Sequence, residues 1–194
     1  MELLEPDRIA ELLSALGERL ALARAPVELV VIGGSALTIL GLVERPTRDV
    51  DVVALLDAGE LRSAKPLPAD VVEARNAVAA DFGVGEGWLN EGPGDLLQWG
   101  LPDGFVERLT RRGFGPALTI HLASRLDQIH FKLYALVDQG HGRHEEDLRA
   151  LTPTEDELRA AARWTITQDP SDGFRQELLG ALRYLGVEDV SLGD

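Results

Sequence analysis

The chain has 194 residues, of which 45% are hydrophobic, enough for one α/β domain or a small domain with a helical appendage. Its formal net charge of −14 argues against broad non-specific binding to nucleic acid, because such binding needs Lys and Arg to neutralise phosphates. It has no cysteine, which excludes disulfides and cysteine-based zinc sites. Neither a signal peptide nor an apolar run of membrane length is recognisable, so we expect a cytoplasmic protein that does not contact a membrane.

The N-terminal part of the chain predicts a packing helix followed by a buried strand. Apolar residues recur at helical spacing over residues 3–23, and Pro6 followed by Asp7 suits a first turn. After Pro26, the segment Val30–Ile32 is apolar, β-branched and stopped by glycine, which is typical of a buried strand.

A glycine bend follows this strand. Gly33 and Gly34 allow a tight turn and let backbone N–H groups approach a ligand closely. Ser35 is expected to cap a short helix over residues 36–42, and the N-terminus of a helix favours anions. The bend is therefore a candidate phosphate-binding turn.

The loop after this short helix carries two arginines and a threonine. Arg45 and Arg48 could bind substrate phosphates, for which the planar guanidinium is well suited, or could pair with neighbouring acidic side chains. Thr47 is expected to form local hydrogen bonds that order the loop. The sequence leaves both roles open for the arginines.

Two carboxylates stand at the start of the next apolar run. Asp49 and Asp51 flank Val50, and the run continues to Leu56 as a predicted strand. Because strand side chains alternate, both carboxylates are expected on one face, roughly 7 Å apart. Such a pair beside apolar neighbours is costly unless a cation joins it, and Mg²⁺ with phosphates as further ligands fits.

The Gly-Gly-Ser turn, the short helix and the Thr47-x-Asp49-x-Asp51 pattern together resemble the minimal nucleotidyltransferase fold, which is related to DNA polymerase β. The resemblance implies an α+β fold with a short mixed sheet flanked by helices. It also implies that the two aspartates bind Mg²⁺ or Mn²⁺ and that the turn binds a nucleoside triphosphate. The alternative is a glycine-rich turn in an unrelated α/β domain, with both aspartates solvated at a sheet edge. The expected nucleotide-binding residues are Gly33, Gly34, Ser35, Arg45, Thr47 and Arg48.

The middle of the chain predicts one helix between irregular segments. Residues 57–69 are expected to form a polar loop or broken helix, and residues 70–80 a helix. Trp88 and Trp99 lie in a glycine-rich stretch and are interpreted as core residues rather than as platforms for base stacking. The triplet Trp88-Leu89-Asn90 resembles one found in a subgroup of these nucleotidyltransferases.

A basic cluster and a further strand come next. Arg108, Arg111 and Arg112 are interpreted as part of a solvated strand or turn, and the alternative is a positive rim for a polyanion. Residues 118–123 alternate and predict a strand, with His121 as a surface residue on its other face.

The following helix contains one of only two lysines in the chain. Ser124 is expected to cap a helix with one apolar face, and Lys132 lies on this helix between Phe131 and Leu133. A semi-buried lysine needs a partner, for which we expect the aspartate pair or a triphosphate. His141 and His144 follow in a polar, glycine-rich loop, where zinc binding is not favoured.

The segment Asp127-x4-Lys132-Leu-x-Ala, followed by a charged loop and Asp147-Leu148, resembles later motifs of the abortive-infection toxin branch of nucleotidyltransferases. The resemblance implies that Lys132 contacts the nucleotide and that Asp147 completes the site, with Asp127 and Arg143 as supports. It departs at Glu146, which stands where the family usually has lysine before the Asp-Leu pair. We expect Asp147, or less favourably Glu86, as a third carboxylate. The expected reaction transfers a nucleoside monophosphate to an RNA such as tRNA, or to a protein, with an antitoxin protein as partner; a nucleotide-binding protein without transfer activity is the alternative.

The C-terminal part predicts two capped helices. Thr154 is expected to cap a helix that reaches about residue 167, with Glu157 completing a capping box. Ser171 and Asp172 begin a last helix over residues 173–185. We therefore expect a nucleotidyltransferase core with its N-terminal helix at residues 1–123 and a helical part at residues 124–194 packed on that core.

Overall fold

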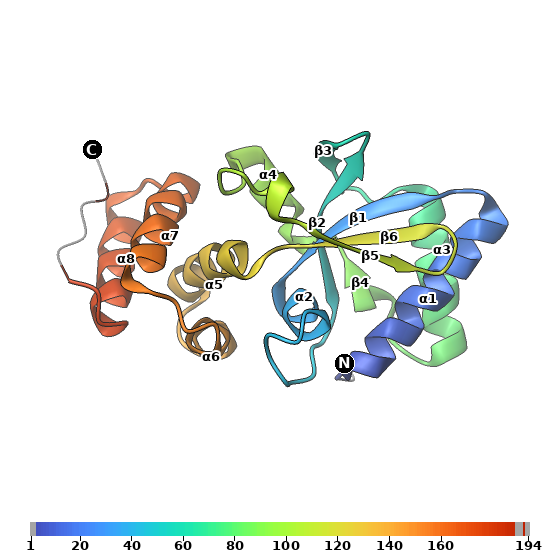
Figure 1. The fold of residues 1–194 in the computed structure, drawn as a ribbon, viewed down its shortest axis with the longest axis horizontal. Helices are drawn as coiled ribbons and strands as arrows, with labels where there is room; N and C mark the ends of the chain where they lie inside the picture. Colours follow the sequence, from blue (N-terminus) through green and yellow to red (C-terminus); the bar gives the residue numbers. More distant parts are fainter. Residues whose placement is uncertain (1–2, 189–191, 193–194) are drawn as a thin grey trace. The chain divides into compact units, whose positions relative to one another are not determined.

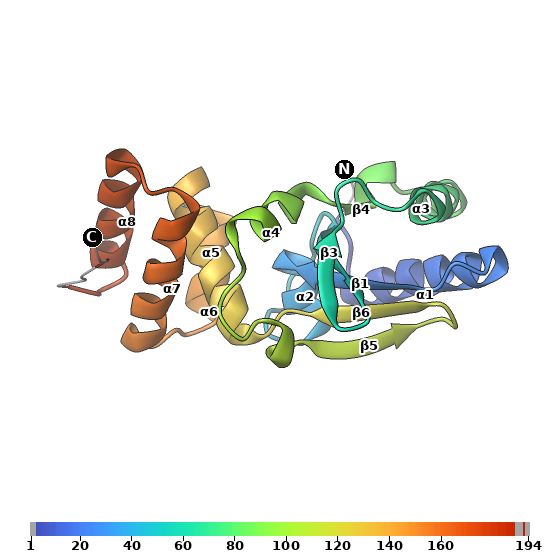
Figure 2. The same cartoon turned by 90° about the horizontal axis from the view of Figure 1, so that it is seen from above.

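The computed structural model describes residues 3–188 and residue 192, and Figures 1 and 2 show the ribbon from two directions. The chain divides into two compact units, residues 1–123 and residues 124–194. In the described ranges, none of the helices combines the length and the apolar character that a bilayer crossing requires.

The first unit contains all the strands of the described chain together with the N-terminal helices. Its α-helices are α1 (Pro6–Ala23), α2 (Gly33–Ile39), α3 (Ala69–Phe82) and α4 (Leu96–Trp99). Its 3-10 helices are η1 (Glu86–Trp88), η2 (Gly92–Asp95) and η3 (Val106–Arg108). Its strands are β1 (Val27–Ile32), β2 (Val50–Asp57), β3 (Glu60–Ser63), β4 (Leu89–Asn90), β5 (Thr110–Phe114) and β6 (Leu118–Leu122).

The strands form one mixed sheet. Their order is β3-β2-β1-β6-β5, and the short strand β4 pairs with β2 outside this path. Strand β1 is antiparallel to β2 and parallel to β6, whereas β5 and β6 form an antiparallel pair. This confirms the expected α+β class with a mixed sheet, and it brings the end of β1 beside the start of β2, where Ile32 pairs with Asp51.

Helices α1 and α3 supply the apolar layer of the first unit, and they lie next to each other in Figure 2. One cluster of buried side chains joins Leu16 of α1, Val31 of β1, Val78 of α3 and Ile120 of β6. Removing such side chains from water is the main favourable term in folding. The sheet end that carries the bend is thereby held on a packed helical layer.

A hairpin replaces the first part of the loop or broken helix expected at residues 57–69, where that expectation is wrong, whereas residues 64–68 are irregular as expected. Asp57 pairs with Glu60, so only Ala58 and Gly59 connect β2 to β3. Both adopt positive φ, at 50° and 86°, as the favoured two-residue hairpin turns require. Alanine rarely adopts positive φ, so the residue at position 58 gave no indication of this turn in the sequence.

The second unit is helical in its described residues. Its helices are α5 (Arg125–Gln139), α6 (Arg143–Ala150), α7 (Glu155–Gln168) and α8 (Asp172–Tyr184), and α5 contacts the other three. Ser124, Thr154 and Ser171 cap α5, α7 and α8 through their hydroxyl oxygens, and Thr154 with Glu157 forms the expected capping box. The packing of this part on the first unit stays a prediction.

Helix α6 contradicts the polar loop expected between Asp138 and Asp147. It places His144 inside a helix rather than in a glycine-rich loop. Only Asp147 and Leu148 of its residues are buried, and no side chain caps its start at Gly142. Its sequence carries signals of a helix, with Glu145 and Glu146 in the first turn and Arg149 in the last, and contact with α5 adds to its stability.

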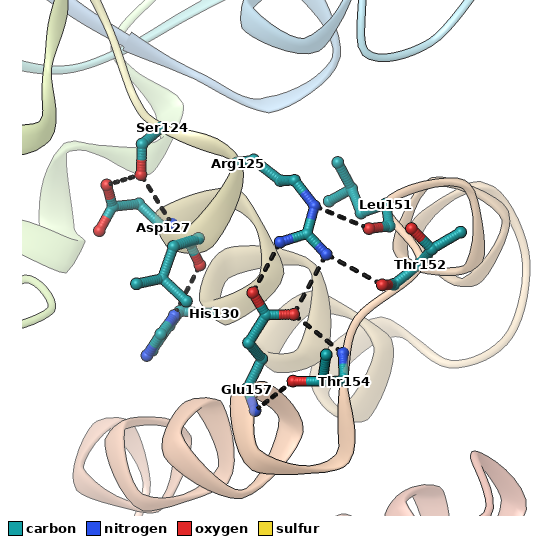
Figure 3. A network of polar contacts seen from close by, with 9 residues as sticks. Ser124, Arg125, Asp127, His130, Leu151, Thr152, Thr154 and Glu157 are labelled. Atoms are coloured by element: carbon teal, nitrogen blue, oxygen red, sulfur yellow. Dashed lines mark hydrogen bonds and ion pairs between the residues drawn. The ribbon is translucent and has the colours of Figure 1, made fainter.

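Arg125 ties the start of α5 to the connection between α6 and α7, as Figure 3 shows. Its guanidinium donates to the carbonyl oxygens of Leu151 and Thr152, each at 2.9 Å. It also donates to both carboxylate oxygens of Glu157, at 2.6 and 3.1 Å. These hydrogen bonds lower the pKa of Glu157, with the Arg125 side chain as the largest cause. The Arg125 side chain thus supplies hydrogen-bond donors to carbonyl oxygens after the end of α6 and to a carboxylate in the first turn of α7.

Candidate functional site

The bend between β1 and α2 lies directly against the first residues of β2. Gly33 has a φ of 76°, a conformation that side chains rarely adopt. A Cβ atom on Gly33 would lie 2.8 Å from Oδ2 of Asp51, closer than carbon and oxygen tolerate without movement. The absence of a side chain at Gly33 therefore leaves room for the Asp51 carboxylate beside the bend.

The second glycine of the bend is approached by the arginine-containing loop. A Cβ atom on Gly34 would lie 2.8 Å from Oγ1 of Thr47 and 3.3 Å from Nη2 of Arg45. Thr38 of α2 donates to the carbonyl oxygen of Arg45 at 3.1 Å, and Thr47 forms backbone hydrogen bonds with Leu4. The structure thus gathers Gly33, Gly34, Arg45, Thr47 and Asp51 in one place.

Ser35 does not cap a helix, which corrects the expectation from sequence. Helix α2 begins at Gly33, its N-cap residue is Ile32, and Ser35 lies inside its first turn. The residue is fully buried, and its Oγ has no hydrogen-bond partner among the residues that the structure describes. A buried hydroxyl without a partner costs free energy, so this atom marks the bend as a place where a polar ligand would be stabilised.

Asp49 and Arg48 stand at the entrance of β2. Asp49 is half-buried and precedes the first strand residue, Val50, which is fully buried. Arg48 is exposed, and no acidic partner lies within ion-pair distance of it in the described ranges. Whether Asp49 and Asp51 share one face stays a prediction, as does the phosphate-binding role of Arg48.

Asn90 is a polar residue of the site to which sequence reasoning assigned no role. Strand β4 runs parallel to β2 and pairs Asn90 with Asp51. The Asn90 side-chain amide donates to Oδ1 of Asp51 at 3.2 Å. The sequence offered only the resemblance of the triplet Trp88-Leu89-Asn90 to one found in a subgroup of nucleotidyltransferases, because a contact across 39 residues leaves no local pattern.

Lys132 and Asp147 pair with each other inside the second unit. Lys132 Nζ lies 2.7 Å from Oδ2 of Asp147, and their side chains are 5% and 1% exposed. The pair joins α5 to α6, and charges buried this deeply require a partner. Nearby on α5, Asp127 accepts a hydrogen bond from Ser124 at 2.5 Å, whereas Arg143 begins α6 and is exposed. The role of both supports in catalysis stays a prediction.

Three of the four histidines pair with a carboxylate or a side-chain amide, whereas His130 contacts the carbonyl oxygen of Leu126. His121 is buried rather than a surface residue, which corrects the expectation, and its Nε2 lies 2.5 Å from Oε2 of Glu28. His141 Nδ1 lies 2.7 Å from Oε2 of Glu145, and His144 pairs with Gln139. The hydrogen bond with His141, followed by those from Arg149 and Tyr184, lowers the pKa of Glu145 to about 2.

The tryptophans and the basic cluster occupy different environments. Trp88 is 1% exposed and belongs to the core, as expected, whereas Trp99 is 64% exposed and is not a core residue. Arg111 and Arg112 are exposed on β5, the outermost strand of the main sheet path, which agrees with a solvated strand. Charged side chains on such a strand discourage unwanted pairing with another sheet.

Within residues 3–188 and residue 192, no cluster of three or more His, Cys, Asp or Glu side chains is placed to hold a metal ion.

The chain matches no protein-family model, and neither a curated protein nor a solved structure is significantly similar to it.

Proposed function

We propose that this protein is a nucleotidyltransferase that moves a nucleoside monophosphate from a nucleoside triphosphate to a hydroxyl group of an RNA or a protein. The observation that carries the proposal is the Asp51 carboxylate lying against Gly33, at the bend where β1 ends. A carboxylate beside the start of helix α2 and an unpartnered buried hydroxyl is suited to metal-assisted phosphate chemistry.

Asp49 and Asp51 are the residues that would hold Mg²⁺ or Mn²⁺. Carboxylate oxygens are the ligands that these hard cations prefer, and triphosphate oxygens would complete the coordination. The Ser35 hydroxyl, buried without a protein partner in the described chain, fits a polar ligand at the same bend. When bound, the ion would neutralise negative charge that develops on the pyrophosphate leaving group.

The other residues of the bend would bind and orient the triphosphate. Gly33, at the start of α2, would let a phosphate approach the backbone N–H groups of the helix, and Arg45 with Arg48 would contact the phosphates through their guanidinium groups. The acceptor hydroxyl would then attack the α-phosphorus in line, forming one P–O bond while the bond to pyrophosphate breaks. Positioning of this kind accounts for much of the catalysis in phosphoryl transfer.

The test is transfer of labelled nucleotide to RNA. Purified protein is incubated with each of the four labelled triphosphates, Mg²⁺ and total RNA, and the labelled products are separated by size. Asp51→Asn is expected to reduce transfer by a factor of about 10²–10³, because the cation that would neutralise charge at the reacting phosphate loses a negatively charged ligand. The matched control is Asp57→Asn, at the exposed far end of the same strand, where the carboxylate pairs with Arg62. Equal activity in Asp51→Asn and wild type would refute the assignment.

The resemblance to abortive-infection toxins extends the proposal to tRNA as the acceptor and to an antitoxin protein as a partner. Comparing purified tRNA with total RNA from which tRNA has been removed tests the acceptor. If the label enters only protein, the acceptor is a protein hydroxyl rather than an RNA hydroxyl.

The ion pair of Lys132 with Asp147 favours a second candidate, a nucleotide-binding protein without transfer activity. Each group neutralises the other within the second unit, which suits a structural role as well as a catalytic one. Calorimetry with ATP and Mg²⁺ separates the two candidates. Binding that is lost in the double variant Asp49→Ala/Asp51→Ala, without transfer of label by wild type, would select the second.

A further inference from the structure

Asn90 presents its side-chain nitrogen to the carboxylate on which the proposed function depends. Its Nδ2 donates to Asp51 Oδ1 at 3.2 Å, and the two residues are partners in the pairing of β2 with β4. The other oxygen of Asp51, Oδ2, is the one that lies beside Gly33. The two oxygens of Asp51 therefore have different surroundings: one faces an amide donor and the other faces the bend.

The orientation of the Asn90 amide follows from a second hydrogen bond. The backbone N–H of Gly92 donates to Asn90 Oδ1 at 2.8 Å. Only the amide oxygen can accept this bond, so the amide nitrogen has to face Asp51. Asn90 is consequently a donor toward Asp51, and its oxygen is already engaged by the backbone.

The segment that carries Asn90 is anchored in the core of the first unit. Trp88 and Leu89 are 1% and 0% exposed. Trp88 Nε1 donates to the carbonyl oxygen of Arg75 on α3, and Arg75 donates to the carbonyl oxygen of Leu89, both at 3.3 Å. Buried, hydrogen-bonded neighbours of this kind limit the positions that the Asn90 side chain can take.

We propose that Asn90 is a positioning residue, which holds Asp51 so that Oδ2 is presented at the bend for a divalent cation. The inference rests on the proposed function, because it gives Asp51 the role of metal ligand. Residues that hydrogen-bond to a metal-binding carboxylate fix its direction, and their loss commonly weakens metal affinity. Asn90 acts through Asp51 and does not itself contact the reacting phosphate.

Two substitutions at Asn90 separate this role from support of the backbone. Asn90→Asp has the same shape and keeps an oxygen to accept from Gly92 N–H, but it replaces the donor to Asp51 by a negative oxygen. Asn90→Leu removes both hydrogen bonds. The matched control is Gln98→Glu, which makes the same change of amide to carboxylate beside another aspartate, Asp95, on the exposed helix α4.

The experiment measures binding of Mn²⁺ to the full chain by electron paramagnetic resonance, with Mn²⁺ alone and then with each triphosphate added. Asn90→Leu is expected to bind Mn²⁺ about tenfold more weakly than wild type. Asn90→Asp is expected to bind Mn²⁺ more weakly as well, because it keeps the acceptor for Gly92 N–H but replaces the donor that holds Asp51 by a negative oxygen that repels the Asp51 carboxylate. Gln98→Glu is expected to match wild type, and thermal unfolding checks that each variant is folded.

The outcomes distinguish the inference from the proposed function. If Asn90→Asp binds Mn²⁺ as wild type does while Asp51→Asn loses binding, Asn90 serves only the Gly92 backbone, and the inference is overturned while the proposed function stands. Weaker binding in both Asn90 variants supports positioning, because Asn90→Asp alters only the bond donated to Asp51. If Asp51→Asn and wild type bind Mn²⁺ equally, the metal site itself is refuted and the inference falls with it.

Discussion

At the bend between β1 and α2, the Asp51 carboxylate occupies space that a side chain on Gly33 would fill. Gly33 combines a φ of 76° with a close approach to Asp51 Oδ2. These are separate requirements: the backbone angle is strained for any other residue, and the space is already taken by oxygen. Gly41 also has a positive φ but has no atom within 4 Å of an added Cβ. Comparing substitutions at Gly33 and Gly41 therefore separates the effect of backbone strain from the effect of the contact with Asp51.

Gly33→Ala is expected to reduce both stability and nucleotide transfer. The strained φ alone costs about 1–2 kcal/mol, and displacement of Asp51 adds the loss of function. The control is Gly41→Ala, at a φ of 70° with nothing within 4 Å of the added Cβ, which carries the strain without the contact. Urea unfolding and labelled-nucleotide transfer are measured on both. Similar unfolding free energies with transfer lost only in Gly33→Ala would support the contact, and equal transfer would count against it.

Contacts between elements are set by close approaches and by shared hydrogen-bond acceptors. Gly17 of α1 lies so near the β5–β6 turn that a Cβ there would be 1.9 Å from the carbonyl oxygen of Phe114. Only glycine allows the helix and the hairpin to meet at this distance. In the second unit, Arg125 connects three elements through its planar guanidinium, which lysine cannot imitate.

Arg125→Lys is expected to lower the unfolding free energy of the second unit by about 1–3 kcal/mol, because hydrogen bonds to a charged group are lost. Arg183→Lys, at an exposed position of α8 without a side-chain partner in the described ranges, is the control. Arg125 lowers the pKa of Glu157 in the folded state, so its stabilisation is present above the ordinary value of 4.5 and declines as the pH falls through the lowered pKa. Urea unfolding at pH 7 and pH 3 measures both effects. An equal gap between variant and wild type at the two pH values would contradict this account.

The net charge of −14 acts on the molecule as a whole. Like charges repel in the compact state, and salt screens them over distances longer than the Debye length, about 8 Å at 0.15 M. Because acidic groups outnumber basic ones, the exposed Arg111 and Arg112 of β5 are a local basic feature on an acidic protein. The net charge argues against broad non-specific binding of nucleic acid. Stability is therefore expected to depend on ionic strength.

Raising NaCl from near zero to 0.15 M is expected to raise Tm by about 2–4 °C, the shift that 1 kcal/mol produces in a chain of this size. Scanning calorimetry in NaCl and in KCl at equal ionic strength separates screening from binding of a particular ion. A fall in Tm with added salt would show that attractive ion pairs, such as Lys65 with Asp95, outweigh the repulsion.

The sequence by itself determined the parts of this protein that depend on neighbouring residues. The caps at Ser124, Thr154 and Ser171 and the strand before Gly33 follow from signals within one helical turn or one strand. Such signals are read correctly because their energies are local.

Tertiary structure alone decided the contacts that join distant segments. The placement of Asn90 on Asp51, the partner of Lys132 and the burial of His121 depend on elements that meet only after folding. The hairpin at Ala58–Gly59 lacks a strong local signal, and Ser35 has the sequence context of a cap although α2 begins two residues earlier. For Asn90, Lys132 and His121, packing and long-range hydrogen bonds decide the contact, because burial involves larger free energies than a single cap or turn.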